Sequence, residues 1–443
     1  MKHTTQHTHA HTHTHTHTHT HTYTHTTQHK MVSLCSARGV MAAVAVAVAV
    51  AAVAMLEIGC GNGSVIMDLV EDGETGTSTF HINTTDAATQ PILINGVNVL
   101  QELAFQQQQL SLLELRLCSL SPPAADETTL ANVVTGDTKF GGAELAPNGL
   151  IYGIPASATY AFILDPATNS LDTTTISGFN ATRKWARGAL APTGIIYGVP
   201  GHSDSVLRID PETNSATQLP HPSVASSSGG KWVSAVVGLD GRVYCVPWSA
   251  SAVLILDPAT DTMDATTFDG LGTGEYKWHS GAVASDGRLF LIPRRAQHIL
   301  ILDPANGAMD TTSLAGFAQG DKWFGGVQLD NGLFYAIPWN SDENFLILDP
   351  DTGTYDDTSL VSPDGKFLAA AVAPNGKIVC VPDERSYVAL VDPKTNTVDV
   401  TSIGDLQQVG AGFLHVDAVT APNGLVYFIP HVANNFVIVN PGC

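Results

Sequence analysis

Short apolar and polar runs alternate along most of the chain, and the same runs recur. From Lys231 one unit reads "KWVSAVVGLDGRVYCVPWSASAVLILDPATDTMDATTF". Its four apolar or alternating segments, separated by turn residues, predict four β-strands. The "DG" after the first segment predicts a tight hairpin, because both residues tolerate positive φ. A proline ends the second segment because it has no N–H for the ladder. "DPAT" predicts a turn after the third strand, and "MDATTF" a polar outer strand.

This unit occurs seven times at a spacing of 43–48 residues. The hairpin glycine recurs at Gly149, Gly194, Gly241, Gly287, Gly332, Gly376 and Gly424. The proline recurs at Pro155, Pro200, Pro247, Pro293, Pro338, Pro382 and Pro430. Four strands in each of seven repeats predict an all-β, seven-bladed β-propeller over residues 126–443.

The two ends of the repeat region predict how the ring closes. The seventh unit stops at Cys443, after its third strand. The segment "DETTL", Asp126–Leu130, matches "DTTTI", Asp172–Ile176, which is the outer strand of the first unit. We therefore expect the N-terminal segment to complete the last blade and cover its edge. A Cys118–Cys443 disulfide would pin this closure in an oxidising compartment.

The apolar period changes before the propeller. Leucines at a 4-3 spacing over 97–120 predict a short helix, which is either a coiled coil that joins homo-oligomers or one amphipathic helix packed on a neighbouring domain. The "SPPAA" of 121–125 predicts a linker. Residues 55–96 are rich in Gly, Thr and Asp with short apolar runs, and predict a small β-rich collar.

Two segments at the start of the chain are unlike the rest. Residues 1–30 are a His/Thr low-complexity tract, which either binds metal or is upstream sequence that is not translated, with Met31 as the start. Residues 31–54 contain an Arg, a long Ala/Val run and a small-x-small site, as in a secretory signal peptide or a signal anchor. Either interpretation predicts a secreted or extracellular-surface protein.

The net charge of the chain excludes some classes of partner. The 41 acidic and 20 basic side chains give −21, which repels nucleic-acid phosphates and anionic membranes. Membrane contact is expected only if 39–56 is retained as an anchor. Three sequons, at Asn62, Asn83 and Asn180, fit a secreted glycoprotein.

The repeats resemble those of YVTN-type propellers, as "GGAELAPNGLIYGIP" from Gly141 shows, with "YGIP" or "YCVP" in place of the signature tetrapeptide. The resemblance implies the fold, and the fold alone implies no activity. A second resemblance is superficial: "LEIGCGNGS", 56–64, is similar to the first motif of S-adenosylmethionine-dependent methyltransferases. The segment up to the predicted helix is too short for the doubly wound domain of those enzymes.

Strand direction sorts the loops into two faces, and all six tryptophans fall on the face of the B–C and D–A loops (A to D being the strands of a blade from the axis outward). A Lys-aromatic pair begins the inner strand of six units and gives repeated channel-mouth residues, which either bind a ligand or pack between blades. They include Lys184, Trp185, Lys231, Trp232, Lys277, Trp278, Lys322 and Trp323.

Residues that break the repeat are stronger candidates for ligand binding, because a functional site breaks the symmetry of the ring. Those on this face are Trp248, Trp339, Arg294, Arg295, His279, Asp383, Glu384, Arg385, His202 and His431.

Catalysis is disfavoured by the inner strands. Propeller lactonases hold an axial metal with carboxylates and amides, yet the inner strands here offer only Glu144, His279 and Asp417. We therefore expect no metal and no cofactor. The sequence favours a non-catalytic propeller that binds a carbohydrate or protein ligand. The alternatives are an extracellular, lactonase-like hydrolase or lyase with its site at the Trp-bearing face, and a structural matrix component.

Overall fold

The computed structural model describes residues 122–442, apart from 228–229, 341–342, 364 and 408–412, together with six strands among the first 98 residues. The chain divides into two compact units, Met1–Arg116 and Leu117–Cys443. None of the described residues belongs to a helix with the length and apolar character that a membrane span requires.

The first unit contains two small antiparallel sheets. One has the order β1 (Thr27–Ser33), β3 (Val65–Asp72), β4 (Ser78–Thr84), and the other the order β2 (Ile58–Gly59), β5 (Leu93–Ile94), β6 (Val97–Asn98). Strand β6 contains the first two residues of the predicted helix. Residues 99–121, most of 1–54, Cys60, Asn62, Cys118 and Cys443 lie outside the described residues, so the predictions made on them remain predictions.

The second unit consists of seven antiparallel four-stranded sheets. The innermost strands are β8 (Phe140–Leu145), β12 (Trp185–Leu190), β16 (Trp232–Val237), β20 (Trp278–Val283), β24 (Trp323–Gln328), β28 (Phe367–Val372) and β32 (His415–Thr420). The second strands are β9 (Ile151–Pro155), β13 (Ile196–Pro200), β17 (Val243–Pro247), β21 (Leu289–Pro293), β25 (Phe334–Pro338), β29 (Ile378–Pro382) and β33 (Val426–Pro430).

The third strands are β10 (Tyr160–Asp165), β14 (Ser205–Asp210), β18 (Leu254–Asp257), β22 (Leu300–Asp303), β26 (Leu346–Asp349), β30 (Val388–Asp392) and β34 (Val437–Asn440). The outer strands are β11 (Ser170–Ser177), β15 (Ser215–Pro220), β19 (Thr262–Asp264), β23 (Ala308–Asp310), β27 (Thr354–Asp356), β31 (Thr397–Ile403) and, in the last blade, β7 (Ala124–Asp126).

Neighbouring inner strands contact one another around the whole ring, and β32 of the last blade contacts β8 of the first. The unit is therefore a closed, seven-bladed β-propeller, as the repeat predicted. The second strands are almost wholly buried, because both of their faces pack against neighbouring blades.

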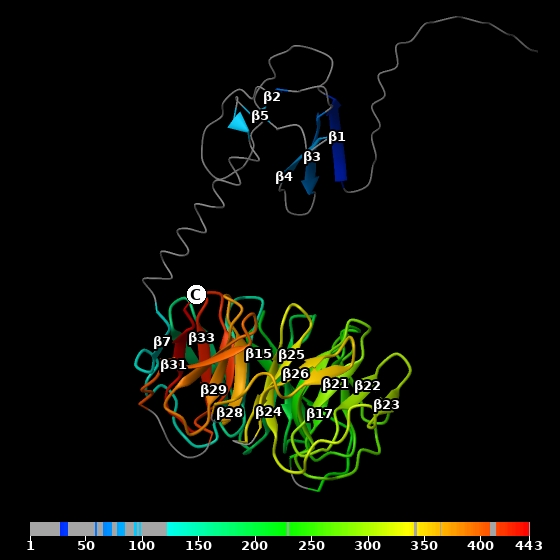
Figure 1. Ribbon diagram of the computed structural model, residues 1–443, viewed down its shortest axis with the longest axis vertical. Helices are drawn as coiled ribbons and strands as arrows, with labels where there is room; N and C mark the ends of the chain where they lie inside the picture. Colours follow the sequence, from blue (N-terminus) through cyan, green and yellow to red (C-terminus); the bar gives the residue numbers. More distant parts are fainter. Residues whose placement is uncertain are drawn as a thin grey trace, which may run out of the picture. The chain divides into compact units, whose positions relative to one another are not determined.

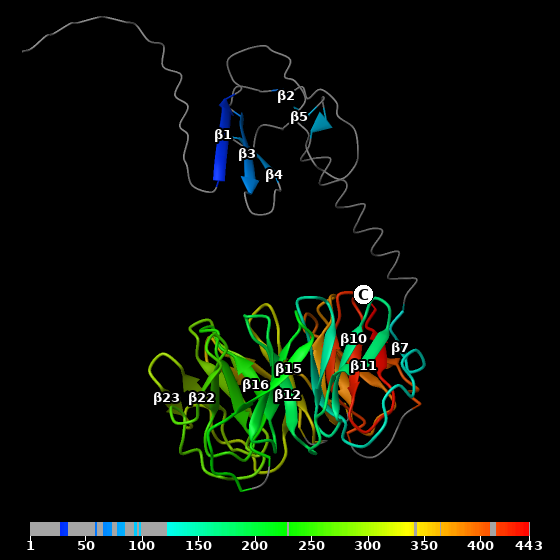
Figure 2. The same ribbon diagram turned by 180° about the vertical axis from the view of Figure 1, so that it is seen from behind.

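The N-terminal segment closes the ring. In β7, Ala124, Ala125 and Asp126 pair with Asn440, Val439 and Ile438 of β34. Figures 1 and 2 both show β7 beside the last blade. Closure is confirmed, but the strand lies at 124–126, so it begins inside the predicted linker and ends where the prediction began.

Strand β7 ends at Asp126 because of a local side-chain turn. The Asp126 carboxylate accepts bonds from the Thr128 N–H at 2.7 Å and the Thr129 N–H at 3.1 Å, and this Asx turn ends the strand. Asp264 does the same with Thr266, which is why β19 is shorter than the predicted "MDATTF".

Side chains near the A–B hairpins tie adjacent blades together. Gly149 has φ of 81°, as the tight turn requires. The Tyr152 hydroxyl donates to Asn214 Oδ1 at 2.6 Å in the C–D turn of the next blade, and the Tyr197 hydroxyl donates to Asp261 Oδ1 in the same way. These bonds fix the angle between blades at the face opposite the tryptophans.

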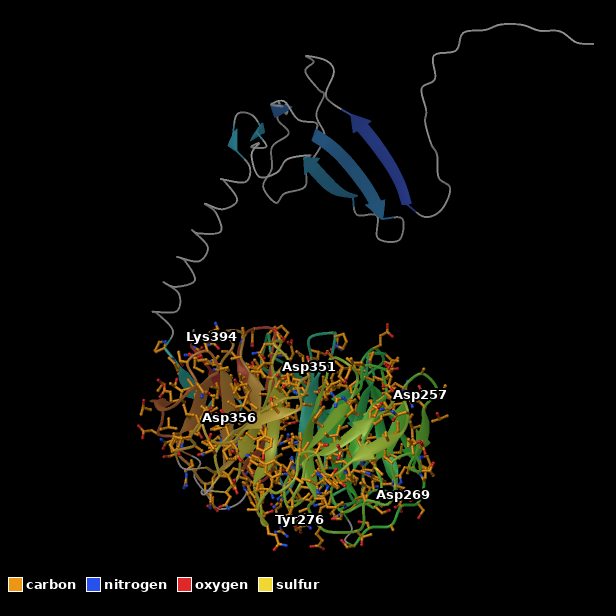
Figure 3. All side chains as sticks on the ribbon, turned by 45° about the vertical axis from the view of Figure 1, so that its right-hand side comes forward. Asp257, Asp269, Tyr276, Asp351, Asp356 and Lys394 are labelled. Atoms are coloured by element: carbon orange, nitrogen blue, oxygen red, sulfur yellow. The ribbon has the colours of Figure 1, made fainter. Side chains whose placement is uncertain are left out.

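The two faces are visible in Figure 3. Asp351 and Lys394, both in C–D turns, lie at one edge of the propeller, and Asp269 and Tyr276 from a D–A loop lie at the other. The D–A loops and B–C loops thus share one face of the propeller.

Candidate functional site

The tryptophan that begins four inner strands is buried between blades. Trp185, Trp232, Trp278 and Trp323 are at most 2% exposed. Each indole Nε1 donates to a backbone carbonyl of its own blade, at 2.7–3.1 Å; the acceptors are Ser205, Ala252, His298 and Asn344. These rings hold the blades and present little surface to a ligand.

The lysine before each of these rings bonds to the backbone. Lys184 Nζ donates to the Ala158 carbonyl at 2.9 Å, and Lys277 Nζ to the Ala250 carbonyl at 2.8 Å. Both acceptors belong to the preceding blade. Burial lowers the pKa of both lysines to about 8. Lys322 is also buried, whereas Lys231 is half-buried and pairs with Asp204 at 3.3 Å.

The second residue of six inner strands lines an axial pocket. Strand pairing shifts register within the first few residues of every inner strand, so each blade carries a bulge there. Bulges redirect side chains. The pocket-lining members of this position are Gly141, Ala186, Val233, His279, Phe324 and Val416. Most are small, and the two large exceptions are His279 and Phe324.

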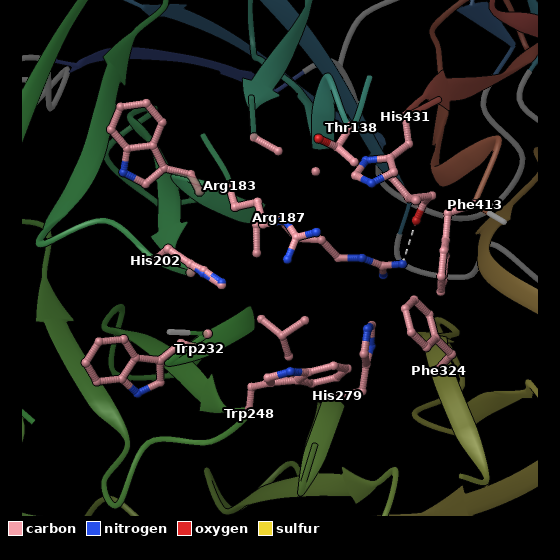
Figure 4. A pocket seen from close by; sticks show the side chains of 18 residues that line it. Thr138, Arg183, Arg187, His202, Trp232, Trp248, His279, Phe324, Phe413 and His431 are labelled. Carbon is pink, nitrogen blue, oxygen red and sulfur yellow. Dashed lines mark hydrogen bonds between the residues drawn. The ribbon is translucent and has the colours of Figure 1, made fainter. Parts of the chain in front are cut away.

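The pocket lies at the mouth of the channel and has a volume of about 380 Å³. Residues from the first, second, third, fourth, fifth and seventh blades line it, so it belongs to the ring and not to one blade (Figure 4). This volume is within the range of small-molecule sites.

Aromatic rings form one wall. Trp248 from a B–C loop stands with its ring centroid 5.4 Å from His279 and 6.3 Å from Phe324. Phe413, before β32, lies 5.7 Å from Phe324 and continues the wall. Trp248, Phe324 and Phe413 are all half-buried, so part of each ring is open to a ligand.

A caged arginine supports this wall from behind. The Arg294 guanidinium lies over the rings of Trp248 (4.6 Å), Phe324 (5.1 Å) and Trp339 (4.4 Å). It is 6% exposed, and its Nε donates to Asp321 at 2.7 Å. Cation–π contacts of a desolvated guanidinium are worth about 2 kcal/mol each, and several together fix the rings in place.

Arginines occupy the opposite side and the floor. Arg187 Nη2 donates to the carbonyls of Leu368 (3.0 Å) and Val416 (2.8 Å), so this side chain crosses the channel from the second blade to the sixth and seventh. Figure 4 shows it reaching across the pocket. Arg183, at φ of 52°, extends from the D–A loop into the same pocket.

Three histidines line the pocket. His279 is 1% exposed, and its Nδ1 is buried without a hydrogen-bond partner. Burial, followed by the positive charges of Arg187 and Arg294, holds the pKa of His279 well below its usual range. Burial also lowers the pKa values of His202 and His431, with Arg183 contributing to both.

Two carboxyl groups of the inner strands, those of Glu144 and Asp417, lie beside Arg187. Asp417 Oδ1 is 3.8 Å from Arg187 Nη1, and Asp417 Oδ2 accepts from the Ala143 N–H at 3.3 Å. Burial and the charge of Asp417 raise the pKa of Glu144 to about 8. Neither residue lines the pocket. Among the described residues, no three His, Cys, Asp or Glu side chains gather closely enough to hold a metal ion.

The structure separates the predicted ligand-binding residues into three groups. Trp248, His279, His202 and His431 line the pocket. Arg294 and Trp339 stand behind its aromatic wall, and Asp383 holds two wall elements by accepting from Trp339 Nε1 (3.1 Å) and the Phe413 N–H (3.2 Å).

Arg295, Glu384 and Arg385 do not line the pocket. Arg295 shares Asp321 with Arg294, and Glu384 pairs with Lys366 at 2.7 Å. Among the predicted glycosylation sites, Asn180 is exposed on the loop before Arg183, and Asn83 lies in β4.

Sequence reasoning missed Arg183, Arg187, Phe324 and Phe413. A signal existed for Arg187, because the third residue of the inner strand is small in five blades and charged in the two that pair, Arg187 and Asp417. Phe324 is likewise exceptional in a position that is otherwise mostly small or aliphatic. Arg183 and Phe413 lie in D–A loops of unequal length, where alignment of the repeats gives no guide.

Comparison with known proteins identifies the fold and no family. No protein-family model and no curated protein sequence matches the chain. Among solved structures, virginiamycin B lyase from Staphylococcus aureus superimposes with a TM-score of 0.56 at 10% identity, over 71% of this chain and 98% of that one. A streptogramin B lyase gives 0.55 at 13% identity, over 72% and 98%.

The extracellular domain of a putative one-component system from B. thetaiotaomicron gives 0.53 at 11% identity, over 72% of this chain and 40% of that one. The chain has the propeller fold. At these identities the likeness confirms the resemblance to propeller repeats at the level of fold, and says nothing of ligand or activity.

Proposed function

We propose that this protein is a secreted or cell-surface, non-catalytic propeller that binds a carbohydrate end group in the axial pocket. The observation that carries the proposal is the half-exposed aromatic wall of Trp248, Phe324 and Phe413 around a cavity of about 380 Å³. The apolar face of a sugar ring stacks on such rings. The unpartnered Nδ1 of His279 can then bond to a hydroxyl.

The alternative class of partner named by the sequence, a protein, fits the pocket less well. Protein interfaces of standard size bury roughly 800 Å² on each partner, spread over 20–30 residues. The features gathered here are concave and converge on the axis, which favours a single inserted group.

The test is binding of the full chain to a glycan array, followed by titration of each ligand found. Trp248→Ala is expected to lower affinity by about tenfold or more, because it removes the stacking surface. The matched control is Tyr355→Ala, which removes an exposed aromatic ring from outer strand β27. Unchanged affinity in Trp248→Ala, with the protein folded, would contradict the proposal.

Secretion is the second part of the proposal and is supported by the signal-like segment 31–54. N-terminal sequencing of the mature protein tests it. A mature N-terminus near residue 55 is expected, and a mature chain that begins at Met1 and stays inside the cell would contradict it.

One observation favours a second function, an extracellular lyase or hydrolase at the same site. His279 lines the pocket, and because its pKa is well below its usual range, its imidazole is neutral at pH 7 and has a lone pair that can accept a proton from a bound substrate, as a weak base. Incubation with the glycans that bind, followed by mass spectrometry, separates the two functions. Product formation that His279→Ala abolishes would replace the binding function by the enzymatic one.

A further inference from the structure

The charged side chains that line the pocket are all of one sign. Among the described residues that line it, none is Asp or Glu, while Arg183, Arg187 and three histidines are present. This contrasts with the chain as a whole, whose net charge is −21. The channel mouth is therefore a local positive region on an acidic protein, which concentrates anions there.

Carboxylates neutralise the positive charge in the pocket only in part. Within the described part of the chain, the Arg183 guanidinium makes no ion pair, and Arg187 has only Asp417, at 3.8 Å. Behind the wall, Arg294 and Arg295 share the single carboxylate of Asp321. Two guanidinium groups in one cavity repel each other, and a bound anion removes that repulsion.

The charges of the two arginines also lower the pKa values of the pocket histidines. Besides burial, Arg183 lowers the pKa values of His202 and His431, which belong to the second and seventh blades, and Arg187 lowers that of His279. Neutral imidazoles around two arginines leave hydrogen-bond donors and acceptors for the remainder of a polar ligand. The Nδ1 of His279, buried and unpartnered, is one such group.

We propose that the axial pocket selects a ring that carries a carboxylate, with the carboxylate on Arg183 and Arg187 and the ring on the aromatic wall. This inference rests on the proposed binding function and names its ligand class: a sugar acid, such as a terminal uronic acid residue. A guanidinium binds carboxylates through charge-assisted, often bidentate bonds. A free aromatic acid has the same chemistry, and the test separates the two sources.

The experiment is isothermal titration calorimetry on the full chain. The ligands are a disaccharide that ends in glucuronic acid, the matched disaccharide that ends in glucose, and benzoate. We expect the acidic disaccharide to bind about 10- to 100-fold more tightly than the neutral one, the range for a hydrogen bond to a charged group. Its binding should also weaken as salt rises.

The variant is Arg183→Gln, because the Arg183 side chain is exposed and supports no other described contact. It should remove the preference for the acidic disaccharide, so that the two disaccharides bind with similar affinity. The matched control is Arg288→Gln, an arginine paired with Asp286 in an A–B hairpin on the opposite face, which should leave the preference unchanged.

Equal binding of the two disaccharides by the wild type would overturn this inference and leave the proposed carbohydrate function standing. Binding of neither disaccharide would overturn the proposed function. Binding of benzoate alone, lost in Arg183→Gln, would support the carboxylate site and overturn the carbohydrate function. A preference that survives Arg183→Gln would overturn the assignment of the carboxylate to Arg183.

Discussion

Glu144 and Asp417 are two carboxyl groups that share one cation, Arg187, in the axial channel. Burial, then the charge of Asp417, raises the pKa of Glu144 from 4.5 to about 8. The pair is thus most stable when Glu144 keeps its proton. Any ligand anion bound above Arg187 would add to the same repulsion, which links this residue to the pocket without contact.

This arrangement makes stability depend on pH. Between about pH 4.5 and 8 the folded state holds a proton on Glu144 that the unfolded state releases, so the free energy of unfolding falls as pH rises through this window. Relative to Glu144→Gln, the wild type should lose on the order of a few kcal/mol across it. Urea unfolding at several pH values measures the difference.

The control for this prediction is Glu212→Gln, which replaces an exposed carboxylate and should leave the pH dependence as in the wild type. Parallel pH profiles for the wild type and Glu144→Gln would show that Glu144 is ionised in the folded protein.

The inner strand is the element that combines scaffold and site. Its first residue packs between blades, its second lines the pocket, and its third lies farther along the channel, where Arg187 meets Asp417. The bulge between them allows one short strand to serve both purposes. Repetition fixes the first position, while the second and third vary among blades.

Replacing the first residue of an inner strand tests whether that position serves blade packing and not ligand binding. Trp323→Phe should lower the free energy of unfolding by about 1–2 kcal/mol, because it removes the bond from Nε1 to the Asn344 carbonyl and part of a buried ring. Phe140 and Phe367 occupy this position in other blades, so the smaller ring is tolerated. Ligand affinity should not change. Urea unfolding and ligand titration measure the two effects.

Tyr355→Phe, on exposed surface of an outer strand, is the matched control and should change stability by less than about 0.5 kcal/mol. If Trp323→Phe weakens ligand binding without destabilising the protein, the repeated tryptophans belong to the site and not to the scaffold.

At the scale of the whole molecule, the sequence predicted the fold well because each blade is a local unit. The hairpin glycine, the strand-ending proline and the Asp-Pro turn act within a few residues of themselves, and seven copies average out the errors of one. Boundaries were predicted less well where a side-chain turn ends a strand early, as Asp126 and Asp264 do.

The site was only partly predictable from the sequence because it is not a local unit. It brings together single residues from blades far apart in sequence, such as Arg187 with Val416 and Leu368. No local pattern encodes such a meeting. Positions that break the repeat found Trp248 and His279, but the same argument also selected Glu384, which pairs with a lysine beside it.

Closure of the ring gives a prediction at this scale. A chain that begins at Pro122 keeps β7, and should unfold in one cooperative transition. A chain that begins at Glu127 lacks β7, exposes the edge of β34, and should melt several degrees lower and associate through that edge. Thermal unfolding and size-exclusion chromatography compare the two. Equal melting temperatures would show that β7 adds nothing to the propeller.

The pairing of β7 with β34, which closes the ring, has a consequence for biosynthesis. Pro122 and Asn440, which meet where the ring closes, are 318 residues apart in the chain. A ribosome adds about 5–20 residues per second, so β7 emerges roughly 15–60 seconds before its partner strand is made. The first strand of the propeller to be synthesised is therefore the last to pair, and throughout that interval the growing ring is an open arc whose two edges need protection from other nascent chains.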